Sequence, residues 1–169
     1  MHFYCEHCKK EYPIATHSYL CECGGLFRLY QSAMDADDRH EAVTLGETET
    51  PLLPLVIEGS RFYLKMEDRQ PTGSFKDRGA KRLIGELAYL GIDRVAIDSA
   101  GNAGAAVAAY AAAAGMVCRV YVPDDISAER AKQITAYGAE VVRVANGRMN
   151  ASSTLRAELG SDYYASHVY

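Results

Sequence analysis

The stretch QPTGSFKDRGAK, residues 70–81, places a lysine at the expected start of a helix, where its amine could be reactive. Ser74 and Asp77 have the spacing of a capping box, which places Lys76 at the second helical position. The positive end of the helix and the neighbouring Arg78 disfavour the protonated amine. A neutral amine can attack a carbonyl carbon and form an imine, and the same helix end attracts phosphate. Both properties suit pyridoxal phosphate; a solvated surface lysine is the alternative.

A second candidate site is the loop SAGNAG, residues 99–104, between a short apolar strand pattern and an alanine-rich helix pattern. Gly101 and Gly104 let the backbone approach a ligand, and the N–H groups of a helix start suit a carboxylate or phosphate. Asn102 adds a donor and an acceptor, or serves only as a turn residue. A dinucleotide-binding loop is disfavoured because the G-x-G-x-x-G spacing is absent.

The cysteines suggest a metal. Four of the five crowd into the first 23 residues, as Cys5, Cys8, Cys21 and Cys23. In a reducing compartment such clustering favours a structural zinc site over disulfides. The C-x-C spacing of the second pair is tighter than the common knuckle, so a metal-free module held together by aromatic side chains is the alternative. Cys118 begins an apolar run and is expected to be a buried strand residue.

The sequence divides into three regions with different patterns of apolar and polar residues, and these regions position the candidate site residues. Residues 1–32 alternate aromatic and polar residues around the cysteines and form a zinc-ribbon-like segment. Residues 33–50 are acid-rich without apolar periodicity, which is typical of a linker. Residues 51–169 alternate strand and helix patterns. Strands that alternate with helices of this length predict an α/β fold, with a parallel sheet and right-handed βαβ crossovers.

Composition excludes several classes of protein. The 169 residues carry a formal net charge of -4 and no dense Lys/Arg stripe, so nucleic-acid binding is not expected. No window has the roughly 18 apolar residues of a membrane span. The N-terminus lacks the pattern of a signal peptide, so a cytoplasmic location is expected.

Residues 51–169 resemble the threonine synthase family, and more broadly the fold type II (tryptophan synthase β-like) pyridoxal phosphate enzymes. The motifs that carry the resemblance are KMEDRQPTGSFKDRGA, DSAGNAGAAVAAYAAAAGM and KQITAYGAEVVRV. It implies that Lys76 holds pyridoxal 5′-phosphate as an internal aldimine and that Asn102 hydrogen-bonds the cofactor's 3′-hydroxyl. Ala100 departs from the family, where Ser or Thr is usual, so backbone donors would serve there. The resemblance also implies a loop for the carboxylate of a small amino-acid substrate, made of Ser99, Ala100, Gly101, Asn102 and Ala103.

The reaction implied is conversion of O-phosphohomoserine to threonine and phosphate by β,γ-replacement. Family members are considerably longer and often begin with a cysteine segment ending CxCGG, as Cys21–Gly25 does here. This chain is therefore expected to be a truncated, inactive N-terminal part with an incomplete fold. Its exposed apolar surface would be covered by a homo-oligomer or a complementing C-terminal half. The alternatives are a threonine/serine dehydratase, a β-replacing synthase such as cysteine or cysteate synthase, or a non-catalytic zinc-bearing interaction module.

Overall fold

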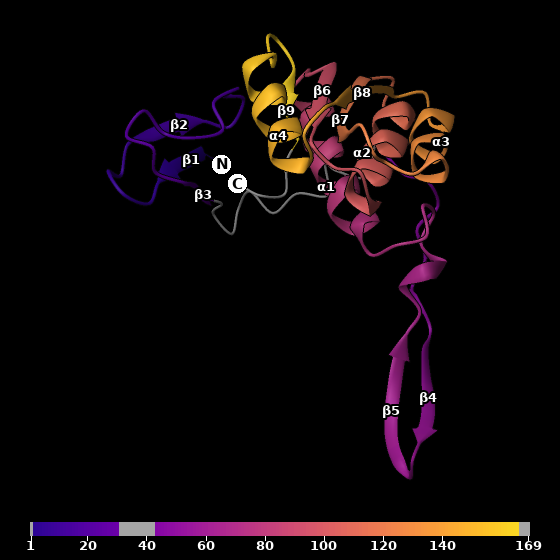
Figure 1. Ribbon diagram of the computed structural model, residues 1–169. Coiled ribbons are helices and arrows are strands. Elements are labelled where there is room, and N and C mark those ends of the chain that lie inside the picture. The colour runs from indigo at the N-terminus through magenta and orange to yellow at the C-terminus, as the bar shows by residue number, and fades with distance from the viewer. Residues whose placement is uncertain (1, 31–42, 166–169) are drawn as a thin grey trace.

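The computed structural model describes residues 2–30 and 43–165. Within them lie an N-terminal cysteine module, an isolated β-hairpin and an α/β unit (Figure 1). The four-stranded sheet of the α/β unit is parallel throughout, which confirms the predicted fold class. Residues 31 and 32 of the expected cysteine segment, residues 33–42 of the expected linker and residues 166–169 lie outside the described part.

The parallel sheet has the order β8-β7-β6-β9. Its strands are β6 (Arg94–Ile97), β7 (Val117–Pro123), β8 (Glu140–Val144) and β9 (Tyr163–Tyr164). The chain runs outward from β6 to β8 and then returns to the other side of β6. In open parallel sheets, ligands bind beyond the carboxyl ends of the strands where the direction of winding reverses. The topology therefore directs attention to the loop that follows β6, where the winding reverses.

Helices cover both faces of this sheet. They are α1 (Lys76–Tyr89), α2 (Asn102–Ala113), α3 (Ala128–Ala136) and α4 (Arg148–Ala157). The first three share one buried apolar cluster, and α4 packs into the other cluster on the opposite face. The predicted crossover helices are thus confirmed. None of the helices within the described residues is long and apolar enough to cross a membrane.

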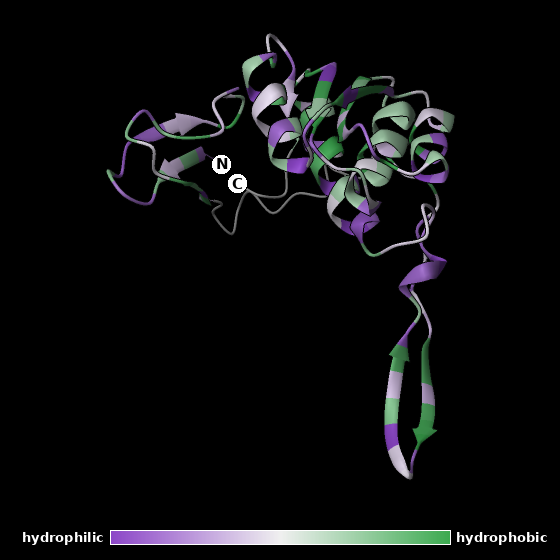
Figure 2. Ribbon diagram, in the orientation of Figure 1, coloured by the Kyte–Doolittle hydropathy of each residue, from purple (hydrophilic) through white to green (hydrophobic). Residues whose placement is uncertain are grey.

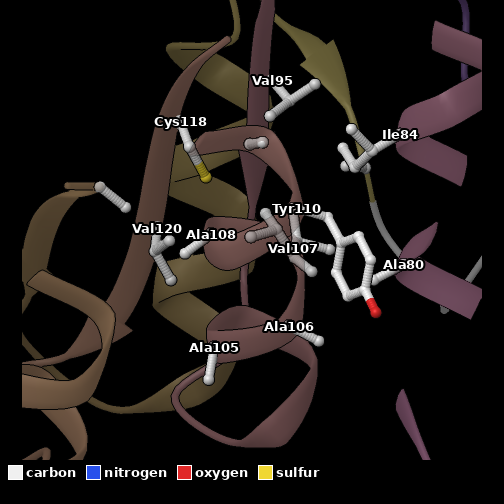
Figure 3. Close-up of a cluster of buried hydrophobic side chains, with 14 of the residues drawn as sticks. Ala80, Ile84, Val95, Ala105, Ala106, Val107, Ala108, Tyr110, Cys118 and Val120 are labelled. Carbon is white, nitrogen blue, oxygen red and sulfur yellow. The ribbon is translucent and has the colours of Figure 1, made fainter. Parts of the chain in front are cut away.

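The alanine-rich helix α2 is the centre of the larger cluster. Its residues 103–111 are all buried, because it lies between the sheet and helices α1 and α3. Alanine has high helix propensity, and its small side chain allows close approach of neighbouring elements. Figure 3 shows Tyr110 of α2 directed toward Ala80, with Ile84 and Val95 nearby. Cys118 lies in β7 and is 5% exposed, as predicted for a strand residue.

Residues 43–50, expected as the end of the linker, pack onto the α/β unit. Val43 and Thr50 are each only 4% exposed. The Glu47 carboxylate accepts a hydrogen bond from the Tyr110 hydroxyl at 2.5 Å and pairs with Lys81 Nζ at 3.0 Å. Because Lys81 lies in α1 and Tyr110 in α2, these contacts hold residues 43–50 against both helices. Acid-rich composition alone gave no sign that Glu47 would be a partly buried acceptor.

The Glu47 contacts predict acid-sensitive stability. Burial raises the pKa of Glu47, but the Tyr110 hydroxyl, the Leu45 backbone N–H and Lys81 lower it to about 2, from 4.5. A depressed carboxyl pKa stabilises the fold above pH 4.5, and this contribution is lost as the pH falls toward 2. We expect it to be about 3 kcal/mol of unfolding free energy. Urea unfolding at several pH values should show that the unfolding free energy of Glu47→Gln falls less with decreasing pH than that of the unsubstituted chain. The control Glu49→Gln changes an exposed residue, so it should lose as much unfolding free energy in acid as the unsubstituted chain. An equal loss in both variants would contradict the assignment.

A β-hairpin projects from the α/β unit (Figure 1). It pairs β4 (Leu52–Ile57) with β5 (Ser60–Lys65), antiparallel, and a 3-10 turn, η3 (Glu67–Arg69), follows. Glu58 and Gly59 both have positive φ, as a tight two-residue hairpin turn requires. Every residue of both strands is exposed; β4 is almost wholly apolar, whereas β5 mixes apolar residues with polar and charged ones (Figure 2). A lone two-stranded hairpin is marginal in water, so this surface needs a partner.

Candidate functional site

A cavity of about 480 Å³ lies at the carboxyl ends of β6 and β7. Lys76 lines it together with the whole predicted loop, Ser99, Ala100, Gly101, Asn102 and Ala103. Asp98, Tyr121, Arg130, Gln133 and Arg148 complete its polar lining. The structure therefore brings every residue of the predicted cofactor and substrate set into one cavity. It does so because the lysine helix packs beside α2, which places the two helix starts next to each other.

The lysine loop differs in detail from the predicted capping box. Helix α1 begins at Lys76 itself, and its backbone N–H donates to Ser74 Oγ at 3.3 Å. The fully buried Asp77 carboxylate does not reach back to Ser74. It accepts from the Thr72 backbone N–H at 2.7 Å and from the Thr72 hydroxyl. The turn at Gly73, with φ of 84°, separates Thr72 from the helix start, and both Thr72 donors reach the Asp77 carboxylate. The capping-box prediction is wrong in this respect, and Asp77 instead holds the loop before the lysine.

The Lys76 amine lies at the junction of two cavities. Its Nζ is 5.0 Å from the centre of the Phe75 ring. Besides the polar cavity it lines a second one of about 440 Å³, which is mainly apolar. Arg78, expected to act on the amine, donates to both oxygens of Glu67 and to Thr50. The Arg78 charge is thus partnered by Glu67.

The 99–103 loop leads directly into α2. Gly101 is the N-cap and Asn102 the first helical residue. The first N–H groups of a helix have no intrahelical acceptor, so they can bind an anion here. Gly104 is required because a Cβ on it would overlap the carbonyl oxygen of Ser99. The loop therefore folds tightly against its own helix and presents backbone donors to the cavity.

Sequence reasoning missed several lining residues. Asp98 directly follows β6, is 6% exposed and accepts from the Tyr164 hydroxyl at 2.9 Å. Gln133 donates to the Thr72 carbonyl at 3.4 Å, which ties α3 to the lysine loop. A usable signal existed for Asp98, since a polar residue directly after a buried parallel strand lies at the ligand-binding edge. No comparable signal distinguishes a cavity-lining side chain on a helix such as α3.

A protein-family profile described as pyridoxal-phosphate dependent enzyme matches residues 43–169. The chain belongs to this family. The match includes Lys76, the 99–103 loop and the packed segment that begins at residue 43. It also confirms the resemblance to fold type II pyridoxal phosphate enzymes inferred from the motifs.

Threonine synthases are among the most similar curated relatives of this family member. Those of Synechocystis sp. and Methanocaldococcus jannaschii are 34% and 31% identical over 151 and 171 residues. The matches cover 85% and 83% of this chain but 40% and 42% of the relatives. The chain thus spans less than half of the relatives' length.

Solved structures of the same fold include a serine racemase from Dictyostelium discoideum, with a TM-score of 0.65 and 29% identity. It covers 76% of this chain and 44% of its own. A hydrogen sulfide-producing enzyme from Fusobacterium nucleatum has a TM-score of 0.62 and 28% identity, covering 78% of this chain and 45% of its own. Each is an enzyme to which this chain is similar in fold.

The cysteine module gathers its four thiols at one point. Its antiparallel strands are β1 (His2–Cys5), β2 (Glu11–Pro13) and β3 (Phe27–Tyr30). The four sulfur atoms lie within 4.8 Å of one another, with Cys5 to Cys23 at 3.6 Å and Cys8 to Cys21 at 3.5 Å. Zinc–sulfur bonds of about 2.3 Å give a tetrahedron with edges of about 3.8 Å. The donor set therefore fits a tetrahedral metal, and none of these cysteines forms a disulfide.

The surroundings of the thiols shift the pKa values of two of the cysteines in opposite directions. The Tyr12 hydroxyl, 3.1 Å from Cys21 Sγ, and then the Cys23 backbone N–H lower the pKa of Cys21 to about 6. The Gly25 backbone N–H opposes the change, but the Cys5 and Cys8 thiols raise the pKa of Cys23 to about 12. A Cβ on Gly25 would lie 2.5 Å from Cys5 Sγ, so only glycine lets the chain pass the cluster this closely.

The module contacts the α/β unit through aromatic rings. Tyr19 packs edge-on against Tyr164 with ring centres 5.4 Å apart, and His17 lies 6.0 Å from the Tyr163 ring. Tyr164 is also the residue that donates to Asp98. The module is therefore seated against β9, next to the strand that leads into the candidate site.

Proposed function

We propose that this chain supplies the lysine side of a threonine synthase-like active site, which converts O-phosphohomoserine to threonine and phosphate by β,γ-replacement. The observation that carries the proposal is the single cavity shared by Lys76 and the 99–103 loop, within the segment matched by the family profile. The relatives that match most of this chain are threonine synthases, which favours this member of the family.

The residues of the cavity fit pyridoxal phosphate. Lys76 offers an amine that can bind the cofactor's aldehyde carbon covalently, and the cofactor, when bound, stabilises negative charge on substrate carbon. Lys76 Nζ would also be placed to accept and return substrate protons. The N–H groups at the start of α2 would orient the substrate carboxylate, and Asn102 would hold the cofactor's ring hydroxyl. Asp77, through Thr72, fixes the loop from which Lys76 projects.

The exposed apolar residues of the hairpin indicate that another part of the protein covers it. We propose that β4 and β5 are covered by the remainder of the catalytic fold, since the relatives extend well beyond this match. Val56 and Phe62, 72% and 50% exposed, should then drive self-association when that remainder is absent. Analytical ultracentrifugation should show weaker concentration-dependent association for the double variant Val56→Ser, Phe62→Ser. Unchanged association would contradict the role of the hairpin.

Cofactor trapping tests the assignment of Lys76. Titration with pyridoxal phosphate should give a saturable absorbance near visible wavelengths, and borohydride reduction followed by peptide mass spectrometry should place the pyridoxyl group on Lys76. Lys81, which is held by Glu47, is the internal control and should remain unmodified. Labelling spread evenly over the lysines, or a saturable spectrum that persists in Lys76→Ala, would reject the proposal.

The solved neighbours favour a second candidate, a β-eliminating or β-replacing enzyme acting on serine or cysteine, because a hydrogen sulfide-producing enzyme and a serine racemase share the fold. Activity of the cofactor-loaded protein, assembled with the remainder of the catalytic fold, discriminates between the two candidates. Phosphate release from O-phosphohomoserine supports the first candidate. Sulfide or ammonia release from cysteine or serine, without phosphate release, supports the second. Intact zinc binding with no cofactor binding would instead identify a non-catalytic module.

We also propose that Cys5, Cys8, Cys21 and Cys23 bind one structural zinc ion. The support is the fit of the sulfur spacings to a tetrahedron. Four thiolate ligands fill the coordination shell and leave no open position for a substrate, so the role of this site is to fold the module. Thiolate ligands and a biosynthetic reaction both suit the reducing cytoplasm, which we propose as the location.

A further inference from the structure

Tyr164 of β9 connects the cysteine module to the candidate site. Its hydroxyl donates to Asp98 Oδ1 at 2.9 Å, and Asp98 lines the 480 Å³ cavity. Its ring packs edge-on against Tyr19 of the module. Tyr164 and Asp98 are each 6% exposed, so this hydrogen bond is shielded from water. One buried side chain thus contacts the module through its ring and the cavity lining through its hydroxyl.

The smaller apolar cluster provides a second connection between the module and the cavity. It contains Tyr121 of β7, Ala151 of α4 and Tyr164. Tyr19 of the module packs against this cluster from one side, whereas Tyr121 and Ala151 line the cavity. Close-packed protein interiors transmit displacements because they contain few voids. A change in how the module is seated should therefore reach the cavity wall.

Strand β9 is a short edge strand, and the module packs against it. Its two residues pair with Val95 and Ala96 of β6. The next residue, Ala165, donates its N–H to the Ala96 carbonyl at 2.8 Å. Segments with few contacts open locally at low free-energy cost, so each side-chain contact of β9 affects how often it opens. The ring contact with the module is therefore expected to hold Tyr164 in place.

The proposed zinc site gives the module two states. Small metal modules fold when the metal binds and unfold when it is removed. Only the folded module presents Tyr19 to Tyr164, whereas the α/β unit holds none of the four thiol ligands. Metal binding at the thiols and the position of Tyr164 are therefore linked, and such a linkage between two sites is reciprocal.

We infer that Tyr164 is a positioning residue of the candidate site, and that metal binding to the cysteine module strengthens ligand binding in the cavity by holding Tyr164 against Asp98. This inference rests on the proposed zinc site and on the proposed function, which makes pyridoxal phosphate the ligand. The folded module fixes the Tyr164 ring, and the Tyr164 hydroxyl orients the Asp98 carboxylate. Asp98 directly precedes the 99–103 loop, so its orientation also fixes the start of that loop.

Hydrogen exchange measured by mass spectrometry tests the connection without any cofactor. Chelation of zinc from the full chain should cause a loss of protection in residues 94–104, which contain β6 and the loop after it. Strand β8 lies at the opposite edge of the sheet and should keep its protection. Zinc-loaded Tyr19→Ala should show the same loss while the module stays protected. Unchanged exchange in residues 94–104 after chelation, or an equal loss in β8, would overturn the inference.

The matched control variant is His17→Ala. His17 makes the other ring contact between the module and β9, but it meets Tyr163. Successive side chains of a strand point to opposite faces, and Tyr163 packs against the larger apolar cluster rather than the smaller one. Zinc-loaded His17→Ala should therefore keep the protection of residues 94–104. A loss equal to that of Tyr19→Ala would assign the effect to docking of the module in general and overturn the role of Tyr164.

Titration with pyridoxal phosphate tests the consequence for ligand binding. The dissociation constant should rise about ten-fold when zinc is removed, and also in zinc-loaded Tyr164→Phe, which keeps the ring but loses the hydroxyl. Zinc removal from Tyr164→Phe should then have little further effect. An equal dependence on zinc in Tyr164→Phe and in the unsubstituted chain would overturn the inference. Zinc-dependent protection of residues 94–104 without Lys76-dependent cofactor binding would instead reject the proposed function and support the connection between module and cavity.

Discussion

Gly104→Ala is expected to destabilise the α/β unit by about 3 kcal/mol, at the upper end of the usual cost of overpacking a core. The added methyl group would overlap the carbonyl oxygen of Ser99 and lie 3.2 Å from Val120 Cγ1. A backbone oxygen cannot swing aside as a flexible side chain can, so either α2 or the 99–103 loop must move. Movement of the loop would also displace the donors proposed for the substrate carboxylate. Urea unfolding measures the first effect, and binding of an amino-acid substrate to the cofactor-loaded protein measures the second.

The matched control is Gly79→Ala in α1. No atom lies within 4 Å of the Cβ that it would add. Alanine is favoured over glycine within a helix by roughly 0.5–1 kcal/mol, so this variant should be slightly more stable than the unsubstituted chain. The same Gly→Ala substitution should thus lower the free energy of unfolding at position 104 and raise it at position 79. A Gly104→Ala protein as stable as Gly79→Ala would show that the loop is not packed against α2 as described.

The broad arrangement of the site could be predicted because it follows from chain order. Lys76 and Asn102 each begin a helix that lies at the carboxyl edge of the parallel sheet, and βαβ packing brings such helix starts together. Local hydrogen bonds were harder to predict. Ser74 and Asp77 have capping-box spacing, yet the turn at Gly73 offers Asp77 the donors of Thr72. Several acceptors compete within one turn, and spacing alone does not rank them.

Long-range polar partners were beyond sequence reasoning. The contact of Glu47 with Tyr110 joins residues 63 positions apart and turns part of an expected linker into packed structure. Arg130 and Arg148 look like solvated helix residues in sequence, because cavity lining depends on how α3 and α4 are placed by the sheet. The hairpin was likewise not distinguished from the sheet strands by its sequence. Alternating and apolar residues are compatible with a strand in any sheet, whereas β4 and β5 pair only with each other and are exposed throughout the described structure.

Cys21→Ser is expected to abolish stoichiometric zinc binding and to unfold the cysteine module. Cys21 is 4% exposed, and its sulfur contacts Cys8 Sγ and the Tyr12 hydroxyl. The three short strands of the module contain eleven residues in total, four in β1, three in β2 and four in β3, which is too few to build a stable core. Zinc binding, of the order of 10–16 kcal/mol in small zinc modules, would then supply most of the folding free energy. A serine hydroxyl is a poor substitute for a thiolate ligand.

Zinc content by mass spectrometry and the absorbance of the cobalt-substituted protein measure this loss. Cys118→Ala is the matched control, since Cys118 lies in β7 and is no part of the thiol cluster. It should keep one metal ion per chain although it leaves a small cavity in the core. Chelation should reproduce the effect of Cys21→Ser and leave the helical circular dichroism of the α/β unit largely intact, because residues 2–30 contain no helix. Two results would contradict the zinc site: one tightly bound zinc ion in Cys21→Ser, or no zinc in the unsubstituted protein. The metal-free alternative would then remain, in which aromatic packing around Tyr12 and Phe27 stabilises the module.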